Sequence, residues 1–121
     1  MKILVADDSR AMRMIVVRTL RQAGWAGHEI VEAQDGRQAL TMVGTEDPDL
    51  ILSDWNMPGL SGIELLKVLR GQGSTTPFCF VTSEGSDEMR ALAEQAGALA
   101  LISKPFTAEL FLEILGSVVS A

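Results

Sequence analysis

Short apolar runs alternate with amphipathic segments along this chain, and the alternation predicts strands separated by helices. The short runs predict strands over Lys2–Ala6, Glu29–Ala33, Leu50–Ser53, Phe78–Val81 and Ala98–Ile102. Segments with apolar residues at steps of three and four predict helices over Arg10–Ala23, Arg37–Val43, Ser61–Arg70, Asp87–Gln95 and Ala108–Val119. Such an order is typical of βαβ units and therefore of a parallel sheet.

Local signals set the expected ends of these elements. Residues that can cap the start of a helix stand at Ser9, Ser61, Ser86 and Thr107, and Ser61 with Glu64 has the spacing of a capping box. Stop or turn signals stand at Gly24, Asp35-Gly36, Asp47-Pro48 and Gly97. These signals agree with the hydrophobic pattern, which strengthens the assignment of the elements.

The expected fold is α/β, with a doubly wound five-stranded parallel sheet in the order 2-1-3-4-5, as in flavodoxin-like proteins. The 121 residues suit one domain with one core, so residues 1–121 are expected to form a single domain. The run Leu50–Ser53 is apolar almost throughout, which suits a central strand buried on both faces. In this order the first and third strands are neighbours, and the winding of the chain reverses between them.

Polar residues follow four of the predicted strands at their carboxyl ends. Asp7 and Asp8 follow the first strand, Asp54 the third, Thr82 the fourth and Lys104 the fifth. Ligands of open α/β sheets bind in the crevice at these ends, beside the point where the winding reverses. We therefore expect three carboxylates, a hydroxyl and an ammonium group to gather at one edge of the sheet.

Three clustered carboxylates indicate a cation site. Two unit charges about 5 Å apart repel by roughly 3 kcal/mol at an effective dielectric constant of about 20, and a bound cation offsets this cost. Oxygen ligands favour a hard ion, so we expect Mg²⁺ with Asp8 and Asp54 as direct ligands and Asp7 acting through water. An aspartate beside Mg²⁺, a lysine and a hydroxyl can act as a nucleophile and form an aspartyl-phosphate. Asp54 lies centrally and is the expected nucleophile.

Four motifs in this order resemble the receiver domain of two-component response regulators. They are Asp7-Asp8, Asp54-Trp55-Asn56-Met57-Pro58-Gly59, Thr82-Ser83-Glu84 and Lys104-Pro105-Phe106, and together they span nearly the whole chain. The second and fourth are especially similar to those of the chemotaxis members of the family. Each motif alone is weak, whereas four at the right strand ends are specific.

The resemblance implies a role for each site residue. Asp54 would accept a phosphoryl group from a histidine kinase, and Thr82 and Lys104 would bind that group. Asp7 and Asp8 would bind Mg²⁺ together with the backbone carbonyl of Asn56. The family also implies a cis peptide bond between Lys104 and Pro105, and an output surface on the fourth helix, fifth strand and fifth helix that changes when phosphorylation shifts an existing equilibrium.

Three positions refine this expectation. Family members often carry an aromatic switch residue three positions before the lysine, and this chain has Leu101 there, so a rotating aromatic ring cannot couple the site to the output surface. The residues two positions after the nucleophile and the threonine, Asn56 and Glu84, are of the types that imply a short-lived phosphoryl group.

Composition narrows the partners and the compartment. The formal net charge of −6 argues against binding to nucleic acid or to an anionic membrane. The chain has neither a long apolar run nor a signal-peptide pattern, and its one cysteine, Cys79, is expected to be a buried structural thiol in a reducing cytoplasm. The leading hypothesis is a stand-alone regulator, not an enzyme, that passes its signal to a downstream target protein, with chemotaxis as one setting.

Three other functions fit parts of the pattern. A phosphorelay intermediate would pass its phosphoryl group to a histidine phosphotransfer protein. A Mg²⁺-dependent phosphatase with an aspartyl intermediate usually has a second carboxylate two residues after the nucleophile, where this chain has Asn56. A flavin-binding protein could share the strand order, but an acidic phosphate site does not suit FMN.

Overall fold

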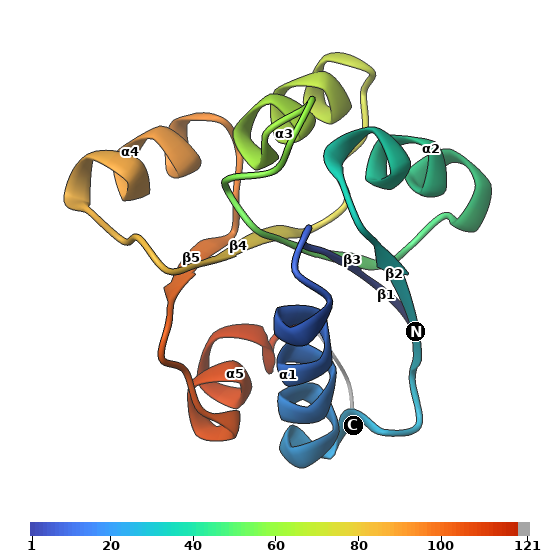
Figure 1. Ribbon diagram of the computed structural model, residues 1–121, viewed down its shortest axis with the longest axis vertical. Helices are drawn as coiled ribbons and strands as arrows, with labels where there is room; N and C mark the ends of the chain where they lie inside the picture. Colours follow the sequence, from blue (N-terminus) through green and yellow to red (C-terminus); the bar gives the residue numbers. More distant parts are fainter. Residues whose placement is uncertain (119–121) are drawn as a thin grey trace.

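The computed structural model describes residues 1–118, in which five strands form one parallel sheet (Figure 1). The strands are β1 (Lys2–Ala6), β2 (Glu29–Ala33), β3 (Leu50–Ser53), β4 (Phe78–Thr82) and β5 (Ala100–Ser103). Their order in the sheet is β2-β1-β3-β4-β5, so the predicted order 2-1-3-4-5 is confirmed.

Helices cover both faces of this sheet. They are α1 (Arg10–Leu20), followed by the π-helical turn η1 (Arg21–Trp25), then α2 (Gly36–Glu46), α3 (Gly62–Gly71), α4 (Asp87–Gln95) and α5 (Ala108–Leu115). In Figure 1, α1 and α5 lie on one side of the sheet, and α2, α3 and α4 lie on the other. The chain is therefore doubly wound, as the alternation of elements predicts.

The core consists of two apolar clusters separated by the sheet. Leu50 and Leu52 of β3 point into the cluster beneath α1 and α5, while Ile51 between them points into the cluster beneath α2, α3 and α4. Successive side chains of a strand point to opposite faces, so a central strand that is buried on both sides must be apolar at every position. The uninterrupted apolar character of Leu50–Leu52 thus follows from its place in the middle of the sheet.

Most predicted ends of the elements are confirmed, because they depend on local capping. The side chains of Ser9, Ser61, Ser86 and Thr107 each accept a hydrogen bond from a backbone N–H of the first helical turn, and Ser61 and Glu64 form the capping box. The strands β1, β2 and β3 and the helix α4 have the predicted bounds. The last helix is shorter than predicted: α5 ends at Leu115, where the N–H of Gly116 donates to the carbonyl of Leu112 at 2.9 Å, whereas the prediction extended it to Val119, which itself lies outside the described residues.

Other elements differ from the prediction at their ends, α3 and β4 by one residue and α1, α2 and β5 by more. The helix α1 does not run regularly to Ala23, because the chain widens into η1 from Arg21 and reverses at Gly24, which has a φ of 100°. The helix α2 is longer than predicted: Asp35 caps it and it continues to Glu46, before Asp47 takes a left-handed φ of 47°. Ile15 lies on α1 at the spacing of three and four residues that its apolar residues share, yet it is 44% exposed.

The strand β5 begins later than predicted. The N–H of Ala98 donates to the carbonyl of Ala93 at 2.9 Å and so closes the end of α4. Ala98 therefore belongs to the helix end, and the strand begins at Ala100 and extends to Ser103, which pairs with Thr82.

We predict that Gly62→Ala lowers the free energy of unfolding by about 2 kcal/mol, since overpacking in a close contact forces the backbone to shift. A Cβ atom at this position would collide with the backbone carbonyl of Asp54 and lie 3.0 Å from the ring of Phe80. The matched control is Gly44→Ala within α2, where a Cβ meets nothing within 4 Å and the better helix propensity of alanine should stabilise the protein slightly. Urea unfolding of both variants checks this, and an unchanged midpoint for Gly62→Ala would show that the contact is not tight.

Candidate functional site

The predicted site residues converge because β1 and β3 are neighbours in register. Ala6 of β1 pairs with Ser53 of β3. Asp7 directly follows Ala6 and Asp54 directly follows Ser53, so the two aspartates leave the sheet side by side. The N–H of Asp7 donates to the carbonyl of Ala33 at 3.1 Å, and the N–H of Asp54 donates to that of Ala6 at 2.9 Å. These bonds continue the sheet into the site and hold both aspartates at its edge.

The three carboxylates form one cluster. One carboxylate oxygen from each of Asp7, Asp8 and Asp54 lies within 4.8 Å of the others. Asp7 is buried, Asp54 is half-buried and Asp8 is exposed, so the cluster opens to solvent on one side. The structure thus brings together the three acidic residues that the strand ends predict.

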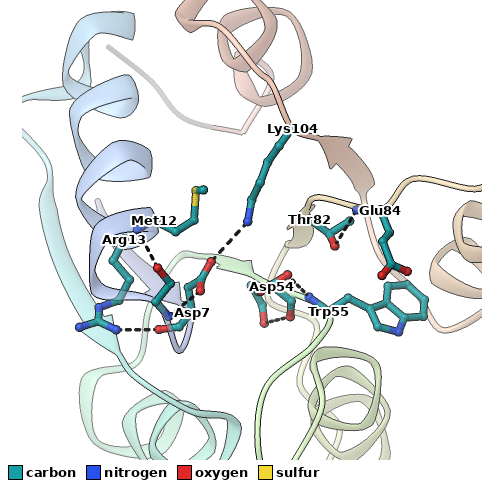
Figure 2. Close-up of polar contacts among 10 residues, drawn as sticks. Asp7, Met12, Arg13, Asp54, Trp55, Thr82, Glu84 and Lys104 are labelled. Atoms are coloured by element: carbon teal, nitrogen blue, oxygen red, sulfur yellow. Dashed lines mark hydrogen bonds and ion pairs between the residues drawn. The ribbon is translucent and has the colours of Figure 1, made fainter.

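Asp7 is held on both its side chain and its backbone. The N–H of Ser9 donates to Asp7 Oδ1 at 2.9 Å, and the guanidinium of Arg13 donates to the Asp7 carbonyl at 2.7 Å. Figure 2 shows this bond between Arg13 and Asp7. Arg13 also pairs with Glu32 on β2, at 3.0 Å. The hydrophobic pattern assigns Arg13 no role, and the signal in the sequence is only a basic residue shortly after the Asp7-Asp8 pair.

Lys104 reaches into the cluster from the end of β5. Its Nζ lies 3.7 Å from Asp7 Oδ2 (Figure 2). Its backbone N–H donates to the carbonyl of Thr82 at 2.8 Å, which ties the two strand ends together. The Lys104–Pro105 peptide bond is cis, as expected.

Asp54 is oriented by the chain that follows it. The N–H of Trp55 donates to Asp54 Oδ1 at 2.8 Å, and the N–H of Gly62 donates to the Trp55 carbonyl at 2.8 Å. The half-buried Trp55 ring packs against Phe80, with ring centroids 4.7 Å apart. Asn56, the next residue, is exposed at the rim of the site.

Thr82 lies on the other side of Asp54 from Asp7 in Figure 2. It is fully buried, and its hydroxyl accepts a hydrogen bond from the N–H of Glu84 at 3.3 Å. Glu84 itself is exposed. The buried Thr82 hydroxyl lies beside Asp54 in Figure 2, while its loop remains accessible to solvent.

Burial and like charge shape the protonation of the cluster. Burial raises the pKa of Asp54, the Asp8 carboxylate adds to this effect, and Lys104 and the Trp55 N–H partly offset it. Burial also raises the pKa of Asp7, where the Ser9 N–H and Lys104 act in the opposite direction and Asp54 in the same direction. Both carboxyl groups therefore carry an electrostatic cost that a further positive charge would relieve.

Cys79 has no part in this site. It is buried in the middle of β4, and burial raises the pKa of its thiol to about 12. The prediction of a structural thiol is confirmed. No helix within residues 1–118 has the length and apolar character needed to cross a membrane.

The donor set fits a hard divalent cation. It consists of carboxylate oxygens only, two of them on partly desolvated groups with raised pKa values. Ions such as Mg²⁺ and Ca²⁺ prefer oxygen ligands, whereas zinc favours nitrogen and sulfur. Asp7, Asp8 and Asp54 are thus the residues that could hold such an ion.

Comparison with known proteins defines the class of this protein. Residues 3–116 match the response regulator receiver domain, and the chain belongs to this family. The chain is therefore a receiver domain of two-component signalling.

Individual relatives include chemotaxis proteins. The chain is 44% identical to the chemotaxis protein CheY-3 of Vibrio cholerae over 110 residues, which make up 89% of this chain and 83% of the relative. It is 39% identical to the chemotaxis protein CheY of Pseudomonas aeruginosa, with 93% of this chain and 91% of the relative covered. The solved structure of Vibrio cholerae CheY4 superimposes with a TM-score of 0.85 at 38% identity, covering 98% of both chains.

We predict that Asp54→Asn raises the free energy of unfolding at neutral pH by about 1 kcal/mol in the absence of divalent cations. The folded protein binds the Asp54 proton more tightly than the unfolded chain, so the wild type loses stability as the pH rises through the raised pKa, and the variant does not. The gain should therefore be small near pH 4 and reach its full size by pH 7. Urea unfolding in a chelating buffer measures it.

Asp35→Asn is the matched control for this effect. Asp35 caps α2, and asparagine fills this role equally well. The free energy of unfolding of Asp35→Asn should therefore be nearly that of the wild type. A loss of stability in Asp54→Asn at neutral pH would contradict the electrostatic cost assigned to the cluster.

Proposed function

We propose that this receiver domain is a phosphorylation switch in which Asp54 accepts a phosphoryl group from a histidine kinase. The observation that carries the proposal is the convergence of Asp54 with two further carboxylates, a buried hydroxyl and a lysine at one edge of the sheet. In the reaction, a carboxylate oxygen of Asp54 attacks the phosphorus of the phosphohistidine. The phosphorus–nitrogen bond breaks as the phosphorus–oxygen bond forms, and the imidazole leaves and takes up a proton.

Residues of this chain prepare Asp54 for that attack. The N–H of Trp55 holds one carboxylate oxygen, which fixes the orientation of the group. Lys104 supplies positive charge, and the Thr82 hydroxyl can donate to a phosphoryl oxygen. Partial burial leaves the Asp54 carboxylate less strongly hydrated. Less bound water then has to be displaced when the carboxylate attacks the phosphoryl group.

Asp7, Asp8 and Asp54, with the backbone carbonyl of Asn56, are the residues proposed to hold Mg²⁺. When bound, the ion would offset the negative charge of the carboxylates and of the transferring phosphoryl group. The acidic donor set and the raised pKa values of Asp7 and Asp54 support this assignment.

We further propose that the signal passes by protein contact to a downstream target in chemotaxis. The relatives named chemotaxis proteins support this setting. The protein would be a phosphoacceptor that loses its own phosphoryl group by hydrolysis, not an enzyme acting on other substrates, and its place would be the cytoplasm. The second candidate, transfer onward to a histidine phosphotransfer protein, uses the same site.

The test of the phosphoacceptor is the intact mass of the protein after incubation with a small-molecule acyl phosphate, with and without Mg²⁺. The wild type should gain one phosphoryl group only when Mg²⁺ is present, and Asp54→Asn should gain none. Asp35→Asn, which keeps the α2 cap, should behave as the wild type. No gain in the wild type would remove the role of Asp54 and leave a receiver that signals by binding alone.

The metal site predicts a change in the fluorescence of Trp55 on titration with Mg²⁺. Trp55 follows Asp54 directly and is half-buried, whereas Trp25 is 1% exposed in the core beneath α1 and α5 and should not respond. Trp55→Phe should therefore abolish the change. Constant emission in the wild type, while calorimetry detects binding of Mg²⁺, would place the ion away from Trp55.

A further inference from the structure

Arg90 links α4 to β5 through two hydrogen bonds. Its Nη1 donates to the backbone carbonyl of Leu101 at 2.8 Å, and its Nη2 donates to Ser103 Oγ at 3.0 Å. Ser103 accepts this bond on the sheet face that α3 and α4 cover, because it lies two residues after Leu101 and side chains alternate along a strand. A single guanidinium group thus holds the middle of α4 to the end of β5.

This link reaches the residues that handle the phosphoryl group. Ser103 is the register partner of Thr82 on the neighbouring strand β4, and side chains of such partners stand next to each other on the same face. Ser103 also directly precedes Lys104, whose N–H donates to the carbonyl of Thr82. Arg90 is therefore bonded to Ser103, which adjoins Thr82 on the neighbouring strand and Lys104 in the sequence.

The loop from β4 to α4 rests on the same contact. A Cβ atom at Gly85 would collide with Ser103 Oγ and lie 3.5 Å from Nη2 of Arg90, so this loop passes directly over the Arg90–Ser103 pair. The loop is also bonded to Thr82, since the N–H of Glu84 donates to the Thr82 hydroxyl (Figure 2). If the Thr82 hydroxyl rotates toward a phosphoryl group on Asp54, the hydrogen bond that it accepts from the Glu84 N–H breaks. The loop released in this way is the one that lies against Arg90.

Leu101 occupies the position, three residues before Lys104, at which receiver domains often carry an aromatic switch residue. It is 5% exposed and lines a hollow of about 450 Å³ between α4, β5 and α5, together with Arg90 and Ile114. A buried leucine offers neither a hydroxyl nor a ring that could change its partner. Arg90, by contrast, has two directional bonds that can break, and its movement would change the wall of this hollow.

We propose that Arg90 couples the phosphoryl site to the α4–β5 surface of this chain, and that its two bonds to β5 hold the unphosphorylated state. The inference rests on the proposed function, since a phosphoryl group at Asp54 is what draws Thr82 away from the loop. Release of Arg90 then frees α4 from β5. Arg90 is a positioning residue, because it acts through Ser103 and the loop and does not touch Asp54.

The experiment is hydrogen exchange of the backbone amides with and without Mg²⁺ and beryllofluoride, a stable mimic of the phosphoryl group. In the wild type, the mimic should accelerate exchange in α4 and β5 relative to β1. Arg90→Met keeps the bulk of the side chain but removes its donors, so these amides should already exchange about fivefold faster without the mimic, as expected for the loss of charged hydrogen bonds. The mimic should then add little.

Arg70→Met is the matched control. Like Arg90, Arg70 donates two hydrogen bonds, here to the backbone carbonyls of Ser74 and Gly97 at 3.1 and 2.9 Å. Gly97 follows the C-terminal end of α4, away from the loop that joins β4 to α4. Its loss should leave the response of α4 and β5 to the mimic as in the wild type. Ser103→Ala, which removes one acceptor only, should shift exchange in the same direction as Arg90→Met by a smaller factor.

The outcomes separate this inference from the proposed function. Binding of the mimic is followed by Trp55 fluorescence. If the wild type does not bind it, the proposed function fails and the coupling fails with it. If the wild type binds the mimic, and Arg90→Met exchanges and responds as the wild type does, then Asp54 keeps its role and Arg90 is not the coupling residue. Slower exchange of α4 in the wild type with the mimic would also overturn the proposal.

Discussion

The sheet must be covered on both faces, and this constraint governs where the protein can hold polar groups. Because both faces of the central strands are covered, every position of β3 and β4 before the last residue of the strand is apolar. Only the strand ends remain for chemistry, and the register between β1 and β3 decides which ends meet. Asp7 and Asp54 lie together because Ala6 and Ser53 are paired, and the third carboxylate follows by one residue.

That arrangement carries an electrostatic cost which the surrounding backbone partly offsets. Burial and mutual repulsion raise the pKa values of Asp7 and Asp54, while backbone N–H groups of Ser9 and Trp55 hold the ionised forms in place. Lys104 supplies one positive charge among three negative ones. The arrangement therefore favours a ligand that brings positive charge.

Three arginines serve the fold by bonding to backbone carbonyls across elements. Arg13 ties α1 to the end of β1, Arg70 ties α3 to the residues before β5, and Arg90 ties α4 to β5. A guanidinium has several donors in a fixed planar arrangement, so one side chain can hold two acceptors at once. All three arginines connect secondary-structure elements, and Arg13 also pairs with the acidic Glu32.

The sequence by itself determined the alternation of strands and helices, the helix caps and the set of residues at the strand ends, because these depend on local periodicity and on bonds within one turn. The features that depend on contacts between residues distant in the sequence were decided only by the tertiary structure. The late start of β5 follows from the Ala98 N–H closing α4, and the exposure of Ile15 follows from how α1 lies on the sheet. The bonds of Arg13 and Arg90 join residues whose proximity no local pattern encodes, since each depends on where a separate strand is placed beside a helix.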